Sequence, residues 1–287
     1  MNRKNLVQQI KEKQSYLCIG LDTDIEKIPV HLQSHSDAVF EFNKQIIDAT
    51  KDLCVAYKIN TAFYEAQGVK GWEALEKTAN YIPSTHFKIA DAKRGDIGNT
   101  SHQYAKAFFE TVPFDAITVA PYMGSDSIKP FLDYKDKWTI VLGLTSNVGS
   151  SDFELQQIVP EGTNILAEKS SSYNSYKSFE GTYLYEKVIF EVSKWGNIDN
   201  LMFVVGATKA ADISSIRKLI PDHFLLIPGV GAQGGSLADV SKHGLNADCG
   251  LLVNASRAII YAGNKENFAE EARAVSLQYQ TEMKSYL

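Results

Sequence analysis

Short apolar segments recur along the chain, and longer amphipathic segments separate them. This alternation is typical of βα units built around a parallel sheet. Eight strands are expected, at residues 16–22, 55–60, 87–93, 116–120, 139–144, 202–206, 224–229 and 250–254. Eight such units predict a closed α/β barrel of the (β/α)8, or TIM-barrel, class.

The composition of the strands supports this prediction. The segments LLIPGVG and GLLVNAS are nearly continuous apolar runs, as expected for strands that helices cover on both faces. The connectors have helical periodicity, for example at residues 36–53, where Val39, Phe40, Ile46 and Ile47 fall on one face. The barrel should therefore have its helices on the outside.

One connector is much longer than a normal βα loop. Residues 146–185 include the Ser- and Tyr-rich stretch AEKSSSYNSYKSFEGTY, which is large enough to be a lid or a local excursion. No internal repeat accompanies it. We expect residues 1–287 to form a single TIM-barrel domain with a loop insertion at about 146–185.

Composition and charge exclude several classes of protein. Hydrophobic residues make up 44% and charged residues 22% of the chain, which is ordinary for a globular protein. The net charge of -5 and the lack of a basic run argue against a nucleic-acid partner. The sequence has no signal-peptide pattern or membrane-spanning stretch, so no membrane association and a cytoplasmic location are expected. The three cysteines, Cys18, Cys54 and Cys249, are predicted to be reduced core residues.

Polar residues stand at the carboxyl ends of the predicted strands, where barrel enzymes carry their chemistry. The segment KIADAKRGDIGNTS contains Asp91, Lys93 and Asp96 in the order D-x-K-x-x-D. Residues two apart in a strand share a side, so Asp91 and Lys93 should project together into the barrel mouth. Lys58 ends the preceding strand and should meet the same group. A structural ion-pair network is the alternative, but buried charges are costly unless paired, and their crowding at this end favours catalysis.

A second group of residues suggests a phosphate site. Glycines in IPGVGAQGG, residues 227–235, follow the seventh strand, and Arg257 follows the eighth. In this fold the loops after these two strands often bind phosphate through backbone N–H groups and a helix start. Arg257 can add a bidentate contact to phosphate oxygens, and Gln233 would lie in the cradle as a neutral amide.

Together these motifs resemble those of a known family. The segment DAKRGDIGNT, the upstream lysine in AYKIN and the downstream PGVGAQGG are similar to those of the orotidine 5′-phosphate decarboxylases. The resemblance runs from CIGLD through VNASR, and SNVGS and VVGAT resemble the longer-chain, type 2 subgroup. It implies conversion of orotidine 5′-monophosphate to UMP and CO2 in pyrimidine biosynthesis, without metal or organic cofactor, by a homodimer.

The resemblance also implies roles for individual residues. Lys93 would deliver a proton to C6 as CO2 leaves, Asp91 would lie against the departing carboxylate, and Lys58 would bind the ribose and orient Asp91. The remaining roles concern the dimer interface and the two ends of the nucleotide. Asp96 and Thr100 would reach the neighbouring subunit's site. Asp22 would bind a ribose hydroxyl, and the phosphate would be held by Gln233, Gly234 and Arg257. The pyrimidine amide edge would be contacted by Ser146 or its neighbour Thr145.

Two other functions remain to be tested. One is a sugar-phosphate decarboxylase or synthase of the same barrel group, which would use D-x-K-x-x-D around Mg²⁺; the cation at Lys58 argues against it. The other is a non-catalytic nucleotide-binding barrel, in which the charged positions would be neutral. The six histidines show no paired ligand spacing, so no metal site is expected.

Overall fold

The computed structural model describes residues 1–158, 183–231 and 234–287. Eight parallel strands pair in sequence order, and the eighth also pairs with the first, so the sheet closes on itself. The (β/α)8 prediction is therefore confirmed. The strands are β1 (Leu17–Gly20), β2 (Ala56–Asn60), β3 (Phe87–Arg94), β4 (Ala116–Val119), β5 (Trp138–Leu144), β6 (Leu201–Val205), β7 (Phe224–Pro228) and β8 (Leu251–Ala255).

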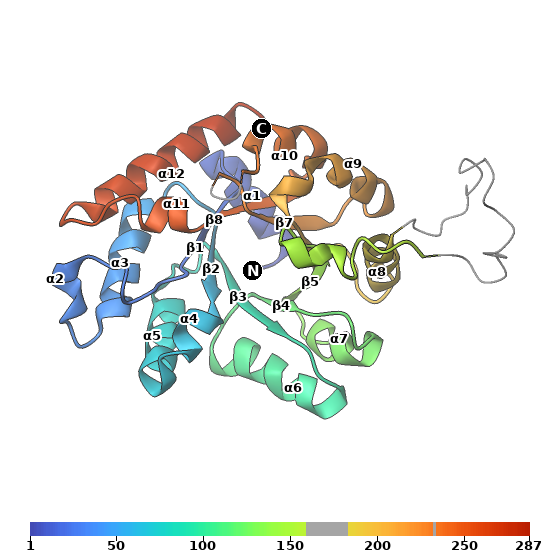
Figure 1. Cartoon of the computed structure of the whole chain (residues 1–287), viewed down its shortest axis with the longest axis horizontal. Helices are drawn as coiled ribbons and strands as arrows, with labels where there is room; N and C mark the ends of the chain where they lie inside the picture. The colour runs from blue at the N-terminus through green and yellow to red at the C-terminus, as the bar shows by residue number, and fades with distance from the viewer. Residues whose placement is uncertain (159–182, 232–233) are drawn as a thin grey trace, which may run out of the picture.

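Helices form a ring around this barrel (Figure 1). A π-helical turn at Ala107–Thr111 extends one of them, and 3₁₀ turns lie at Val148–Ser151 and Ala207–Lys209. No helix in the described part of the chain is both long enough and apolar enough to cross a membrane. The helices are α1 (Arg3–Lys13), α2 (Val30–Gln33), α3 (Ala38–Thr50), α4 (Thr61–Glu65), α5 (Gly68–Tyr81), α6 (Gly98–Lys106), α7 (Ser125–Leu132), α8 (Leu184–Ser193), α9 (Ala210–Leu219), α10 (Leu237–Gly244), α11 (Arg257–Ile260) and α12 (Phe268–Lys284).

The observed boundaries differ little from those expected. The first strand is shorter than 16–22, because the β1 pairing with β2 runs only from Cys18 to Gly20. The helix expected at 36–53 is α3, which spans Ala38–Thr50. Most of the predicted insertion at 146–185 lies outside the described residues.

The barrel interior is filled by large side chains rather than open. Phe87, Trp138 and Phe224 are fully buried and begin β3, β5 and β7, which are alternate strands. Their rings meet edge to face, at centroid distances of 6.0 Å for Phe87 and Trp138 and 6.3 Å for Trp138 and Phe224. Alternate strands contribute such layers in barrels of this class. This layer fills the amino-terminal end of the barrel.

Helix α1 closes the same end from outside. The Arg3 guanidinium donates to the carbonyls of Ile198 and Asp222, each at 2.8 Å, and pairs with the Asp248 carboxylate at 3.1 Å. These acceptors precede β6, β7 and β8. In the described part of the chain, the cavity that the strands form therefore lies at their carboxyl ends.

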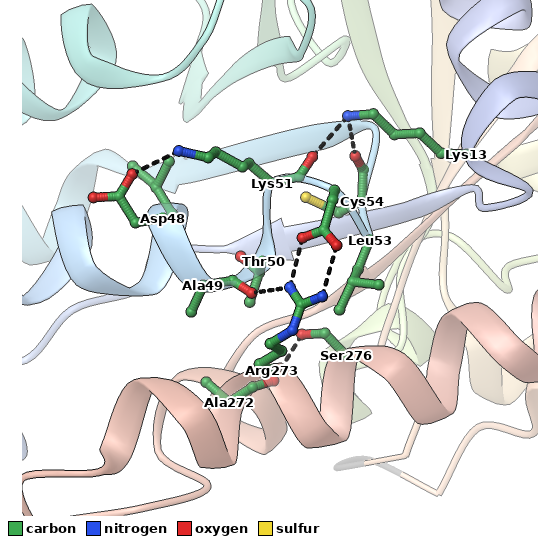
Figure 2. A network of polar contacts seen from close by, with 12 residues as sticks. Lys13, Asp48, Ala49, Thr50, Lys51, Leu53, Cys54, Ala272, Arg273 and Ser276 are labelled. Carbon is green, nitrogen blue, oxygen red and sulfur yellow. Dashed lines mark hydrogen bonds and ion pairs between the residues drawn. The ribbon is translucent and has the colours of Figure 1, made fainter.

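Polar contacts tie the carboxyl-terminal helix to the end of α3 and to the turn between α3 and β2 (Figure 2). Arg273 of α12 donates to the Ala49 carbonyl at 2.7 Å and forms a bidentate ion pair with the Asp52 carboxylate, at 2.6 and 2.7 Å. At the end of α1, Lys13 donates to the carbonyls of Lys51 and Cys54, each at 2.8 Å. The turn between α3 and β2, which leads into the strand that carries Lys58, is thereby contacted from two sides.

Candidate active site

The end of β3 carries two charged side chains into the barrel mouth, as expected. Asp91 Oδ1 accepts a hydrogen bond from Lys93 Nζ at 2.6 Å. The strand is irregular here: Ala90 pairs with Ile117 and Arg94 with Val119, so the two strands change register between these pairs. Lys93 lies in this bulge with φ of 47°, a left-handed conformation that residues with a Cβ rarely adopt. Bulges re-aim side chains next to active sites, and this one carries the lysine.

Lys58 of β2 joins the same carboxylate from the other side. Its Nζ lies 2.8 Å from Asp91 Oδ2 and 3.2 Å from Asp22 Oδ1. The two strands are in register here, with Asn60 opposite Asp91, which places Lys58 beside the aspartate. The predicted meeting of Lys58, Asp91 and Lys93 is therefore present in the structure, with Asp22 added at its edge.

Burial and charge act on this group in opposite directions. Burial disfavours the charged form of Asp91, but the ammonium groups of Lys58 and Lys93 outweigh it and hold its pKa below the usual value. Burial likewise opposes the charge on Lys58, whose side chain is 5% exposed, but Asp91 and Asp22 raise its pKa above the usual value. Both groups are therefore ionised at neutral pH. Lys93 differs in access, because its side chain is 51% exposed.

These side chains line one cavity of about 300 Å³ at the carboxyl end of the barrel. Such a volume is in the range of small-molecule sites. Six predicted residues line it: Asp22, Lys58, Asp91, Lys93, Ser146 and Arg257. Apolar side chains from the inner faces of β5, β6 and β7 supply part of its wall: Leu142, Val204 and Leu226. The cavity thus combines a charged side with an apolar one.

The expected phosphate loop borders the far side of this cavity. Gly229 and Val230 line it together with Arg257. Gly229 and Gly234 have φ of 96° and 84°, which an ordinary residue would adopt only with strain. The Gly234 N–H donates to a carbonyl within the same loop, at 2.9 Å. Gln233 lies outside the described residues, and the contribution of Gly234 to anion binding stays a prediction.

The loop after β5 brings Thr145 and Ser146 to the cavity. The Thr145 hydroxyl contacts Glu154 Oε1 at 2.8 Å and Asn147 Oδ1 at 2.6 Å. A side chain at Gly206 would lie 2.7 Å from the Ser146 Cβ atom, so the glycine of VVGAT permits this loop to approach β6. Both residues line the cavity, and the contact of Ser146 with the pyrimidine stays a prediction.

Asp96 and Thr100 are not among the residues that line the cavity of this chain, within its described part. Asp96 Oδ1 accepts the Ile97 N–H at 2.7 Å, and Thr100 is exposed in the first turn of α6. The structure therefore does not bring these two residues together with Lys93 in one subunit.

Sequence reasoning missed Thr118. Its hydroxyl, on β4, contacts both Asp91 and the backbone of Lys93 at the bulge. The sequence offered no signal for it, because ITV is typical of any buried strand. By contrast, the three cysteines are buried and free, as predicted. No group of three His, Cys, Asp or Glu side chains is arranged to hold a metal ion in the ranges that the structure describes.

Known proteins match the chain over nearly its whole length. The chain is 52% identical over 290 residues to the orotidine 5′-phosphate decarboxylase of Bacteroides fragilis, covering 100% of this chain and 98% of that protein. It is 54% identical over 286 residues to the enzyme of the same name from Flavobacterium johnsoniae, covering 99% and 97%. Among solved structures, Leishmania donovani OMP decarboxylase superposes with a TM-score of 0.76 at 32% identity, covering 98% and 99%. A family model described as the orotidine 5′-phosphate decarboxylase / HUMPS family matches residues 15–272, and the chain therefore belongs to that family.

Proposed function

We propose that the chain decarboxylates orotidine 5′-monophosphate to UMP and CO2 in pyrimidine biosynthesis. The Lys58–Asp91–Lys93 group at the mouth of the barrel carries this proposal, because it supplies a fixed ammonium and a fixed carboxylate within 2.6 Å of each other. Its relatives of that name, at more than half identity over the whole chain, support it.

The reaction requires a negative charge to form at C6 of the pyrimidine. When the bond from C6 to the carboxylate breaks, the electron pair stays in the plane of the ring, where π delocalisation cannot spread it. The Lys93 ammonium stabilises that charge and then transfers its proton to C6, while CO2 leaves. Preorganised electrostatic stabilisation of this kind often contributes more to catalysis than any other single effect.

Asp91 lies against the substrate carboxylate in this arrangement and repels it before the reaction. Two negative charges about 4 Å apart repel each other by about 4 kcal/mol at an effective dielectric constant of about 20. This repulsion is relieved as neutral CO2 forms, but it is a smaller contribution than stabilisation of the carbanion. Lys58 binds the ribose and keeps Asp91 oriented, and Asp22 binds a ribose hydroxyl.

The rest of the nucleotide is held at a distance from the reacting carbon. Arg257 binds the phosphate, with Gln233 and Gly234 contributing from the neighbouring loop, and Ser146 meets the pyrimidine amide edge. Binding energy from the phosphate can position the ring without contacting it.

The whole chain forms one barrel domain, with residues 146–185 as an insertion.

The active form is a homodimer in which Asp96 and Thr100 complete the partner's site. Ile97, Tyr122 and Met123, on the loops after β3 and β4, are 56%, 91% and 48% exposed. Exposed large apolar side chains on these two loops support the proposal, because a surface that another protein covers is typically apolar. A second copy of this chain would cover them and bring Asp96 towards the cavity.

The activity test uses purified chain treated with EDTA. Orotidine 5′-monophosphate should be converted to UMP, as followed by ultraviolet absorbance. A sugar-phosphate enzyme of the same barrel group would instead require added Mg²⁺ and would leave orotidine 5′-monophosphate unchanged. Lys58 argues against that function, because its ammonium already occupies the space between Asp22 and Asp91.

Shared sites are tested by mixing inactive subunits. Lys93→Ala and Asp96→Ala chains, refolded or coexpressed together, should form heterodimers with one intact site. On statistical mixing about half of the dimers are heterodimers, and each has one of its two sites intact. The mixture should therefore recover up to about a quarter of the activity of the unchanged chain. Each variant alone stays inactive. No recovery in heterodimers isolated with two affinity tags would reject the contribution of Asp96 across the interface.

A further inference from the structure

The bulge in β3 is held by a neighbouring strand. Its two flanking pairs, Ala90 with Ile117 and Arg94 with Val119, leave Thr118 as the residue of β4 that faces the irregular part of β3. Thr118 is 1% exposed and lines the cavity. A residue in this place can fix the shape of the bulge and the direction of the side chains on it.

One hydroxyl group connects the two charged residues of the bulge. The backbone N–H of Lys93 donates to Thr118 Oγ1 at 2.9 Å, and the Thr118 hydroxyl donates to Asp91 Oδ1 at 3.0 Å. A hydroxyl can donate once and accept as well, so both contacts are satisfied at the same time. The backbone of one charged residue is therefore tied to the side chain of the other.

In the described part of the chain, three side chains donate hydrogen bonds to the Asp91 carboxylate, and Thr118 is the only uncharged one. The other two are the ammonium groups of Lys58 and Lys93, at 2.8 and 2.6 Å. The three donors come from β2, β3 and β4, and so fix the carboxylate from three strands. Loss of the Thr118 hydroxyl would alter the geometry of the site without changing its net charge.

We propose that Thr118 is a positioning residue for the decarboxylation, which holds Asp91 and the backbone of Lys93 in the arrangement that the reaction needs. This inference rests on the proposed function. The left-handed conformation of Lys93 is unfavourable, and such conformations persist only where their surroundings enforce them. The hydrogen bond from the Lys93 N–H supplies part of that enforcement.

The test replaces the hydroxyl by a methyl group of similar size. Thr118→Val keeps the β-branched shape that suits a buried strand but removes both hydrogen bonds. We expect kcat to fall by about 10- to 100-fold, since a misplaced ammonium stabilises the carbanion less. The KM for orotidine 5′-monophosphate and the Kd for UMP should stay within about threefold, because the expected phosphate residues follow β7 and β8 whereas Thr118 lies on β4.

Two further variants separate positioning from packing. Thr118→Ser retains the hydroxyl and should keep kcat within about threefold of the unchanged chain. Thr139→Val is the matched control: Thr139 is fully buried on the adjacent β5, and its hydroxyl has no hydrogen-bond partner within the described part of the chain. The same chemical change there should leave kcat unaltered. If Thr118→Val does not fold, Thr118→Ala and Thr118→Ser, which differ by one oxygen atom, carry the same comparison.

The outcomes are distinct. A Thr118→Val enzyme with kcat within twofold of the unchanged chain would overturn the role of Thr118, as would a Thr118→Ser enzyme as slow as the valine variant. A parallel loss of UMP affinity would indicate general distortion and also overturn it. If the unchanged chain and Thr139→Val both failed to decarboxylate orotidine 5′-monophosphate, the proposed function itself would be rejected, and the role of Thr118 would be rejected as a consequence.

Discussion

Removal of Lys58 should destabilise the folded chain, and the structure gives the size of the effect. In Lys58→Met the side chain stays unbranched, becomes one atom shorter and loses its charge. The Asp91 and Asp22 carboxylates, whose side chains are 11% and 18% exposed, then lose the cation between them. An interaction at 2.8 Å is worth about 6 kcal/mol at an effective dielectric constant of about 20.

Only part of that energy should appear as lost stability. Burial of the ammonium itself is costly, and its removal recovers that cost, so breaking a buried pair typically destabilises by about 3–5 kcal/mol. Because Lys93 still neutralises Asp91, and the Asp22 side chain is 18% exposed and so partly solvated, we expect a loss at the lower end of that range, about 3 kcal/mol. The measurement is urea denaturation at pH 7, followed by circular dichroism and tryptophan fluorescence.

The loss should depend on pH. The folded-state pKa of Asp91 is depressed in the unchanged chain, so its ion pairs stabilise fully above the unfolded value near pH 4 and are lost only as pH falls through the folded pKa. In Lys58→Met the pKa of Asp91 rises, and the folded variant takes up a proton earlier. The difference in stability between the two chains should therefore be smaller at pH 4.5 than at pH 7.

An exposed ion pair provides the control. Lys77 Nζ lies 2.8 Å from Asp37 Oδ1, the same distance as in the buried pair, but the two side chains are 43% and 42% exposed. Lys77→Met should therefore have no resolvable effect on stability. A Lys58→Met chain as stable as the unchanged one at pH 7, or a loss that does not vary with pH, would refute the explanation of how Asp91 is kept charged.

Three more predictions address the reaction and the core. Lys93→Ala should lower kcat by about 10³-fold or more while circular dichroism stays unchanged, because the proton donor at C6 is gone; residual activity within tenfold of the original would contradict this role. Arg257→Ala should raise the KM for orotidine 5′-monophosphate by about 10- to 100-fold but barely alter the KM for orotidine, which has no phosphate. Arg257→Lys should recover only part of the lost affinity. Equal effects on both substrates would count against phosphate binding by Arg257. Burial, reinforced by nearby cations, lowers the pKa of His86 and His223 to about 4 in the folded chain, so the stability they contribute is complete above about pH 6.5 and declines as pH falls towards 4. Urea denaturation at pH 7.5 and pH 5 measures this decline, and His223→Leu should make it less steep; an unchanged slope would argue against a buried neutral imidazole.

Much of the architecture could be predicted because it depends on local patterns. Eight apolar runs with helical connectors were enough to identify the barrel, since strands covered on both faces have few polar positions. The period of two and the order of the strands also predicted that Lys58, Asp91 and Lys93 come together, although Lys93 reaches this place through a bulge that the period does not predict.

Other features depend on contacts that the sequence does not encode locally. The left-handed conformation of Lys93 follows from the register change between β3 and β4, which no residue type announces. Thr118 could not be distinguished from other buried threonines such as Thr139, because only its position opposite the bulge gives its hydroxyl two partners. The exposure of Tyr122, which the sequence gives no reason to expect of an aromatic residue, emerges only from the folded chain.

The most direct test is a crystal structure of the chain with UMP bound. We expect Lys93 Nζ to lie within hydrogen-bond distance of C6, Asp91 to occupy the space next to that carbon, and the phosphate to contact Arg257. A nucleotide bound elsewhere, or a Lys93 side chain directed away from the pyrimidine ring, would contradict the proposed mechanism.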